Sequence, residues 1–194
     1  MGNKDTITKQ YISRNNIFAD ICNVYFYQGK QVIKPEQLHP LDPQEFTLLN
    51  ASDNSAKKNT PPINKQRDVL KYLTAKATDN AAYLILGIEN QSDIHYAMPV
   101  RNMLYDALQY EQQMQEITEK HRINTEYNNF TSGFQKNDKL IPVITLVVYF
   151  GTKPWDGPMC LHDILQLDNP ILQQYVVDYP LYLIDPHHMD DASL

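Results

Sequence analysis

The sequence predicts a single domain of the mixed α/β class, in which helices flank one sheet. Three apolar runs of strand length, at residues 67–73, 83–92 and 140–150, alternate with two stretches of helical periodicity, at residues 15–27 and 99–125. A chain of 194 residues with 42% hydrophobic and 21% charged residues can bury one ordinary core. The order of the segments predicts the succession αβββαβ.

The first helix is expected over residues 15–27, because apolar residues recur there at helical spacing. Asn15 or Asn16 can serve as its N-cap. Gly29 is expected to end the helix.

Two short strands are expected next, at residues 31–33 and 45–49, where prolines separate short apolar segments. Residues 50–64 are rich in Asn, Ser, Lys and Pro, which is typical of an exposed loop. The strands at residues 67–73 and 83–92 follow, joined by a turn.

The second half continues with a long helix at residues 99–125, in which Pro99 occupies the first turn. The helix carries a mostly apolar series at mixed spacings of three and four: Val100, Met103, Leu104, Ala107, Leu108, Glu111 and Met114. The run at residues 140–150 is β-branched and is expected to be a central strand. A short helix at residues 161–167 and an edge strand at residues 181–184 come next, and residues 185–194 are expected to form a loose tail.

Three polar residues at the ends of two predicted strands are the candidate catalytic site. Glu89 and Gln91 point to one side of their strand because side chains alternate. Asp68, 21 residues before Glu89, begins the preceding strand, so antiparallel pairing would bring both carboxylates to one metal ion. Mg²⁺ prefers such oxygen ligands and can activate water against a phosphodiester. By spacing alone, a solvated acid at a strand end is the commoner explanation.

Four ordered sequence blocks resemble the Rpn family of recombination-promoting nucleases, also called transposases, in the PD-(D/E)XK superfamily. The blocks are Asp68, Ile-Glu-Asn-Gln-Ser at residues 88–92, Met-Pro-Val-Arg-Asn-Met-Leu-Tyr at residues 98–105, and Pro-Val-Ile-Thr-Leu-Val-Val-Tyr-Phe-Gly at residues 142–151. The resemblance implies a restriction-endonuclease-like core within a domain of residues 1–184. Longer family members continue into a helical region, so the resemblance implies a chain that is short relative to them.

The resemblance also implies a Mg²⁺-dependent DNA endonuclease linked to recombination, mobile elements or phage defence, with Mn²⁺ able to substitute. Asp68 and Glu89 would hold the metal, together with the backbone carbonyl of Asn90. Gln91 stands where the superfamily has a lysine, and it would orient water or bind the phosphate. An amide carries no positive charge, so Gln91 cannot supply the electrostatic stabilisation of an ammonium.

Three other residues are possible accessories to this site. Asp20 lies on the first predicted helix, where superfamily members often carry an acid, although a solvated surface acid is the alternative. Arg101 and Tyr105 lie at i and i+4 on one helix face. Arg101 could hold a phosphate or orient Glu89, and a structural ion pair is the alternative.

The charge distribution is uneven. The net charge of −6 argues against broad adhesion to DNA. Residues 1–80 carry 11 basic and 8 acidic residues, a net +3, whereas residues 81–194 carry 6 and 15, a net −9. A DNA path would therefore use N-terminal cations, unless these are ordinary solvated charges: Lys4, Lys9, Arg14, Lys57, Lys58, Lys65, Arg67, Lys71 and Lys76.

Two other function classes stay open. One is a weakly active or inactive relative that binds DNA or protein and regulates or assembles with a full-length partner. The other is an HD-type phosphohydrolase, suggested by His162 and Asp163, which requires a mostly helical fold. A homodimer is expected for paired cleavage. The chain is expected to be cytoplasmic, without membrane contact, because no apolar run reaches membrane-spanning length and the N-terminus is polar.

Overall fold

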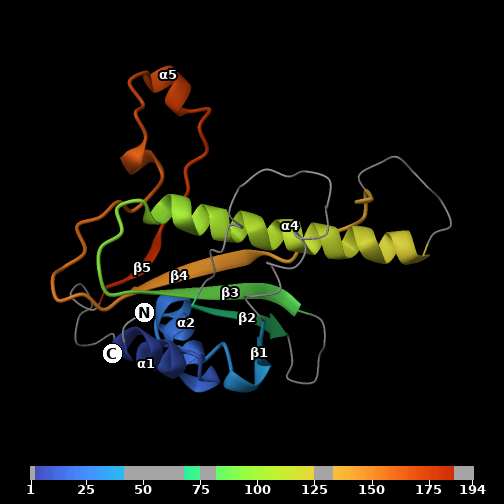
Figure 1. Cartoon of the computed structure of the whole chain (residues 1–194), viewed down its shortest axis with the longest axis horizontal. Helices are drawn as coiled ribbons and strands as arrows, with labels where there is room; N and C mark the ends of the chain where they lie inside the picture. Colours follow the sequence, from blue (N-terminus) through green and yellow to red (C-terminus); the bar gives the residue numbers. More distant parts are fainter. Residues whose placement is uncertain (1–2, 42–67, 75–81, 125–132, 186–194) are drawn as a thin grey trace.

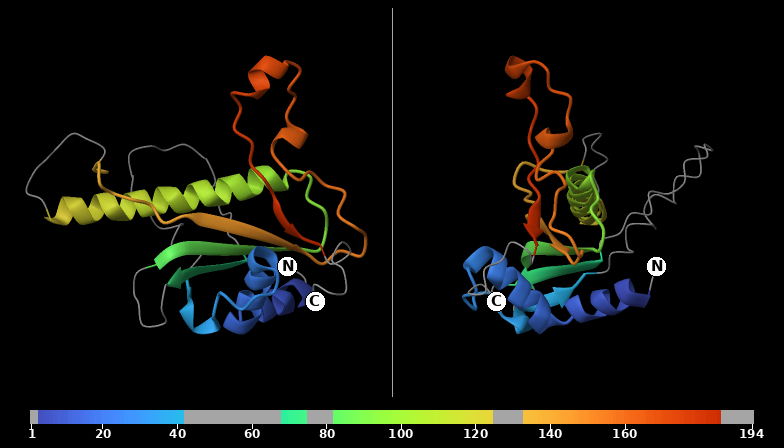
Figure 2. Two further views of the ribbon diagram at one scale, coloured as in Figure 1. Left: turned by 180° about the vertical axis from the view of Figure 1, so that it is seen from behind. Right: turned by 90° about the vertical axis from the view of Figure 1, so that its left-hand side faces the viewer.

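A five-stranded mixed sheet with helices on both faces forms the centre of the protein (Figure 1). The computed structural model describes residues 3–41, 68–74, 82–124 and 133–185. Helices α1 and α2 lie on one face of the sheet and the long helix α4 crosses the other (Figure 2). The mixed α/β class predicted from the sequence is confirmed.

From residue 15 to residue 149 the elements follow the predicted succession αβββαβ, although a helix that was not predicted precedes them and the first strand lies at residues 38–40 instead of 31–33. In chain order the elements are α1 (Asn3–Ile12), α2 (Asn15–Tyr27), the 3₁₀ helix η1 (Pro35–Gln37), β1 (Leu38–Pro40), β2 (Val69–Thr74), β3 (Ala82–Gln91), α4 (Met98–Asn124), β4 (Val143–Tyr149), the 3₁₀ helix η2 (His162–Ile164), α5 (Pro170–Gln173) and β5 (Tyr182–Ile184). The strand expected at residues 45–49 and the loop expected at residues 50–64 lie outside the described residues.

The strands are arranged in the sheet in sequence order. β1 pairs with β2 and β2 with β3 in antiparallel register, whereas β3 pairs with β4 and β4 with β5 in parallel register. Parallel neighbours need a crossover connection, which α4 supplies between β3 and β4. This crossover brings the first turns of α4 back over the carboxyl end of β3.

Helix α2 begins at Asn15, as expected, but Asn15 is not its N-cap. Arg14 occupies the cap position without a side-chain hydrogen bond. The Asn15 amide instead donates to the carbonyls of Pro35 (3.0 Å) and Leu38 (2.8 Å), so it attaches the helix to the segment that leads into β1.

The segment after α2 does not form the strand that was expected at residues 31–33. Gln28 and Gly29 both have positive φ, 54° and 81°, and turn the chain out of the helix. Residues 31–33 are not a strand, because Asn23 takes the backbone groups that a strand partner would use. Its side chain accepts from the amides of Val32 and Ile33 and donates to the Ile33 carbonyl.

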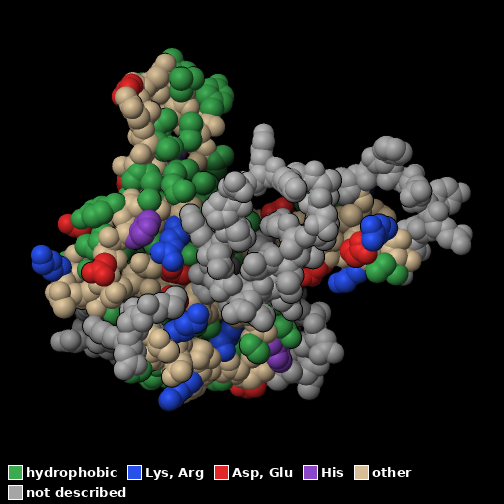
Figure 3. All heavy atoms as spheres, viewed as in Figure 1, with side chains coloured by type: hydrophobic (Ala, Val, Ile, Leu, Met, Phe, Trp, Pro, Cys, Tyr) green, Lys and Arg blue, Asp and Glu red, His purple; other side chains and the backbone are tan. Residues whose placement is uncertain are grey.

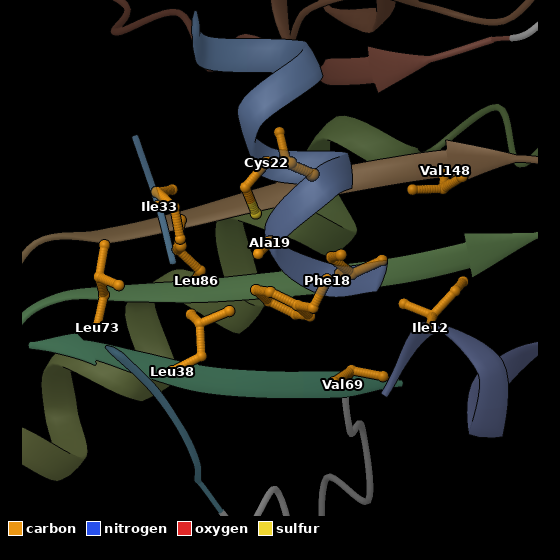
Figure 4. Packing of buried hydrophobic residues seen from close by; sticks show 12 residues of the cluster. Ile12, Phe18, Ala19, Cys22, Ile33, Leu38, Val69, Leu73, Leu86 and Val148 are labelled. Atoms are coloured by element: carbon orange, nitrogen blue, oxygen red, sulfur yellow. The ribbon is translucent and has the colours of Figure 1, made fainter. Parts of the chain in front are cut away.

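The main core lies between α2 and the sheet (Figure 4). Phe18, Ala19 and Cys22 form the buried stripe of α2 and pack on side chains from the strands. Burial raises the pKa of the Cys22 thiol to about 12, because a thiolate would lose its hydration there. Ile12 at the end of α1 joins the same cluster and fixes that helix against the sheet.

Helix α4 packs against the sheet through polar side chains as well as apolar ones. Asn102, Asp106, Gln109 and Gln113 are buried, whereas Val100, Met103 and Met114 from the expected apolar stripe are exposed. The Thr145 hydroxyl donates to Asp106 (2.7 Å), and Gln113 exchanges two hydrogen bonds with the backbone of Ile141. Hydrogen bonds to β4 and the segment before it therefore replace part of the expected apolar contact.

Between β4 and β5 the chain leaves the sheet and forms a projecting arm, residues 159–181 (Figure 1). Backbone hydrogen bonds from Leu161 to Tyr179 and from Leu181 to Met159 close its base. Helical structure within residues 161–167 is limited to η2 (His162–Ile164), so the helix predicted there is shorter than expected. Hydrophobic side chains gather on the arm (Figure 3), and four of them are strongly exposed: Ile171, Leu172, Tyr175 and Val177.

The first residue of the predicted loose tail is ordered and buried. Asp185 accepts a hydrogen bond from the Trp155 amide at 2.9 Å, which fixes the loop after β4. Residues 186–194 lie outside the described residues. Among the helices that the structure describes, none combines the length and the apolar character needed to cross a membrane.

Candidate active site

The pairing of β2 with β3 brings the two predicted carboxylates together. Val69 is the register partner of Ile88, so Asp68 and Glu89 are the next residues on adjacent strands. The Asp68 carboxylate accepts a hydrogen bond from the Asn90 amide at 2.9 Å. The two acids thus converge at one end of the hairpin, as the apolar runs predicted.

Glu89 is held by side chains from its own strand and from α4. Its carboxylate is 2.6 Å from the Arg101 guanidinium and accepts a hydrogen bond from the Gln91 amide at 3.0 Å. Only 1% of Glu89 is exposed, so its charge depends on these partners. Arg101 also donates to the Tyr105 hydroxyl at 2.8 Å. The structure therefore brings Glu89, Gln91, Arg101 and Tyr105 into one cluster.

The pKa shifts show that both carboxylates act on this cluster. Burial alone would lower the pKa of Arg101, but attraction to Glu89, the hydrogen bond with Tyr105 and a weaker attraction to Asp68 raise it overall. The pKa of Tyr105 is raised, first by burial and then by the negative charge of Glu89. Arg101 therefore stays charged and Tyr105 stays a neutral phenol throughout the ordinary pH range.

A second cation approaches the site from the opposite face of the sheet. The Lys9 ammonium on α1 lies 4.0 Å from the Asp68 carboxylate, with 44% of the Lys9 side chain exposed. From the sequence, Lys9 was expected only as one of several cations on a DNA path. Nothing in the sequence linked it to Asp68, because a polar N-terminal helix has no pattern that fixes its position against a strand end.

Lys71 has a structural role in place of the DNA contact expected of it. Only 4% of the residue is exposed, and its ammonium donates to the Ser13 carbonyl at 2.8 Å and to the Asn15 side chain. It also lies over the Phe18 ring. These contacts attach β2 to the junction between α1 and α2. The other two predicted DNA contacts, Lys65 and Arg67, lie outside the described residues.

Asp20 is not brought into the cluster. It is exposed on α2 and accepts a hydrogen bond from the Gln31 amide at 3.3 Å. Among its described contacts, none reaches Asp68 or Glu89. The accessory role predicted for Asp20 therefore has no geometric support here, whereas Arg101 and Tyr105 both contact the Glu89 cluster.

The donor atoms of the site are oxygens, which suit a hard divalent cation such as Mg²⁺. Asp68 and Glu89 supply carboxylates at adjacent strand positions. The N–H and C=O of one strand residue point to the same neighbouring strand, so the Asn90 carbonyl faces the side of Asp68, as its amide does. Among the described residues, no group of three or more His, Cys, Asp or Glu side chains is placed to hold a metal. Within the described part of the chain, a metal would therefore be held by the two acids, the backbone and water.

His162 and Asp163 make contacts within the arm. Asp163 accepts hydrogen bonds from the amides of Met159 and Cys160, and a His162 ring nitrogen lies 2.8 Å from the Val176 carbonyl. A five-stranded sheet is also incompatible with the all-helical HD fold. The phosphohydrolase hypothesis is therefore wrong.

Comparison with known families gives one match. The family model described as "Putative transposase, YhgA-like" matches residues 64–194, about two thirds of the chain. This range contains Asp68, Glu89, Gln91, Arg101 and Tyr105 and leaves α1, α2 and β1 outside. No curated protein and no solved structure matches at a significant level. The chain belongs to the YhgA-like transposase family, which is the Rpn group that its sequence blocks resemble.

Proposed function

We propose that this protein is a metal-dependent endonuclease of the Rpn type that hydrolyses phosphodiester bonds of DNA on a PD-(D/E)XK core. The observation that carries the proposal is the convergence of Asp68 and Glu89 at adjacent strand positions, with Arg101 and Gln91 on the Glu89 carboxylate. Family membership supports a protein that acts on DNA.

The residues have distinct roles in this proposal. Asp68, Glu89 and the Asn90 carbonyl would hold Mg²⁺ or Mn²⁺, which would polarise the phosphate and make water a stronger nucleophile. Arg101 keeps the buried Glu89 ionised and oriented. Gln91 donates its side-chain amide to the Glu89 carboxylate, and Tyr105 fixes the Arg101 side chain through a hydrogen bond.

The burial of Glu89 supports a second candidate function. A carboxylate that is 1% exposed and paired with Arg101 resembles a structural ion pair as well as a metal ligand. Residues 154–194 also contain no Lys or Arg, so this segment supplies no Lys or Arg charge for contacts with DNA phosphates. On this hypothesis the protein binds DNA or a partner protein, such as a full-length paralogue, without cutting.

Cleavage of supercoiled plasmid separates the two functions. The protein would be incubated with Mg²⁺, Mn²⁺ or EDTA beside the isosteric variants Asp68→Asn and Glu89→Gln, and beside Glu36→Gln as a control at an exposed carboxylate on η1. The nuclease proposal expects nicking or linearisation that EDTA, Asp68→Asn and Glu89→Gln each abolish and that Glu36→Gln retains. Absence of cleavage with every metal would favour the binding protein, and light scattering would report whether either form is a homodimer.

A further inference from the structure

We infer that Lys9 is a further catalytic residue of the proposed nuclease site, and that its ammonium contacts the scissile phosphate. The inference rests on the proposed function and assigns a role to a residue of α1, outside the matched family range of residues 64–194. Its starting point is the 4.0 Å separation between the Lys9 ammonium and the Asp68 carboxylate.

The site needs a positive charge that can reach a phosphate. Gln91 is neutral, and its amide donates to Glu89. The Arg101 guanidinium is engaged by Glu89 and Tyr105, and the Lys71 ammonium is buried against Ser13 and Asn15. Among the described cations around the two acids, Lys9 combines a long contact to its carboxylate with a side chain that is 44% exposed.

The position of Lys9 is fixed by the fold. It lies in the last turn of α1, three residues before Ile12, and Ile12 is fully buried in the main core with Val69 and Val148. Residues three apart lie on the same side of a helix, so the anchored Ile12 directs Lys9 toward Asp68, which immediately precedes β2. Exposure of 44% leaves the side chain able to move from Asp68 to a bound phosphate.

The phosphate oxygens are the atoms that need electrostatic stabilisation during hydrolysis. In hydrolysis the water oxygen bonds to phosphorus, the bond from phosphorus to the leaving sugar oxygen breaks, and one water proton ends on that leaving oxygen. Negative charge builds on the non-bridging and leaving oxygens in the transition state. The Lys9 ammonium would donate a hydrogen bond to a non-bridging oxygen and keep its proton, and so lower the barrier electrostatically.

The test compares Lys9→Gln, Lys9→Arg, Gln91→Lys and the double variant Lys9→Gln/Gln91→Lys in single-turnover cleavage of plasmid DNA. Lys30→Gln serves as a control at an exposed lysine after α2. Loss of one such donor is expected to slow cleavage by about 10²- to 10³-fold in Lys9→Gln. Lys9→Arg should retain part of the rate and Lys30→Gln all of it. Gln91→Lys places an ammonium beside the same carboxylates, so the double variant should recover at least about tenfold.

Metal binding distinguishes this role from a purely structural one, in which the loss of Lys9 would weaken the site for metal. If Lys9 contacts the phosphate, Mn²⁺ titration by calorimetry should show that Lys9→Gln binds metal as tightly as the original protein or more tightly, because a like charge beside Asp68 has been removed. Lys9→Met, of similar length and helix propensity, replaces Lys9→Gln if the latter fails to fold.

Three results would overturn the inference. An unchanged rate in Lys9→Gln, with Glu89→Gln inactive, would remove Lys9 and leave the nuclease standing. If Lys9→Gln cleaves slowly and the additional Gln91→Lys substitution does not restore the rate, Lys9 has a structural role. Absence of cleavage by the original protein with any metal would reject both the function and the inference.

Discussion

Arg101 and Glu89 form an ion pair of 2.6 Å between the first turns of α4 and the end of β3. Glu89 is buried, whereas the Arg101 side chain keeps 30% of its surface exposed. The pair therefore joins the interior of the sheet to the surface where DNA would bind. The two residues contribute unequally to stability, because the buried Glu89 cannot regain contact with water when its partner is removed.

Removal of Arg101 should destabilise the protein more than removal of both partners. Arg101→Gln leaves Glu89 as a buried charge and should lower the free energy of unfolding by about 3 kcal/mol. Glu89→Gln/Arg101→Gln should lose less, because no buried charge remains. Urea unfolding measures both.

The same variants report on metal binding. Saturating Mg²⁺ should restore part of the stability of Arg101→Gln, because a bound cation replaces the lost positive charge. It should not stabilise the double variant to the same extent. Arg122→Gln, at the exposed pair with Glu119, is the control and should change stability by less than about 0.5 kcal/mol. Equal losses in Arg101→Gln and the double variant would show that Glu89 is solvated after all.

Lys71→Met should weaken the fold and leave DNA affinity intact. The substitution keeps the apolar stem but removes the hydrogen bonds to Ser13 and Asn15, with an expected loss of about 1–3 kcal/mol. Lys30→Met, at an exposed position, is the matched control for charge. Chemical unfolding and a DNA-binding titration of the folded variant would check the two expectations. A large fall in affinity without loss of stability would return Lys71 to the DNA path.

Tyr179→Phe should loosen the attachment of the arm to α4. The Tyr179 hydroxyl donates to the buried Asp106 carboxylate, which also accepts from Thr145. Loss of a hydrogen bond to a charged group should cost about 1.5–3 kcal/mol. Tyr175→Phe removes a hydroxyl from an exposed tyrosine of the same arm and should be neutral. The comparison of the two unfolding midpoints is the measurement, and equal midpoints would argue against this anchor.

Acid should open the base of the arm. Hydrogen bonds from the Met159 and Cys160 amides lower the pKa of Asp163 below its ordinary value of 3.8. A lowered carboxyl pKa stabilises the fold above the unfolded-state value, and this contribution disappears as the pH falls through the folded-state pKa. The two amide proton shifts should therefore titrate with a midpoint below 3.8. Asp163→Asn should abolish the titration, and a midpoint above 3.8 would contradict the assignment.

The sequence predicted best where a pattern is repeated along an element. Apolar runs of strand length predicted β2 and β3, and the antiparallel pairing of these runs brought Asp68 and Glu89 to the same end. The apolar spacing of α2 predicted its bounds as they are observed, Asn15–Tyr27. Local periodicity determines such elements because each turn or pair of residues repeats the same choice between core and solvent.

Other features depend on contacts that no local pattern encodes. Helix α1 is mostly polar and is held by Ile12 at its end, so periodicity did not predict it. The partners of Asn23, Asn15 and Lys71 are mostly backbone groups of other segments, and each of these side chains would be equally suited to solvent. The polar face of α4 was missed for the same reason, because the buried role of Asp106 depends on Thr145, 39 residues away.

The charges around Asp68 and Glu89 have a thermodynamic consequence. With Lys9 and Arg101 they form a quartet of two negative and two positive groups, which is neutral as a whole. A divalent cation alone would leave this quartet doubly positive, and a DNA phosphate alone would add a negative charge beside two carboxylates. With both ligands bound, the net charge of the site is closer to zero than with the metal alone, so each ligand should increase the affinity of the protein for the other. Cooperative assembly of metal and DNA would then restrict cleavage to the complete complex.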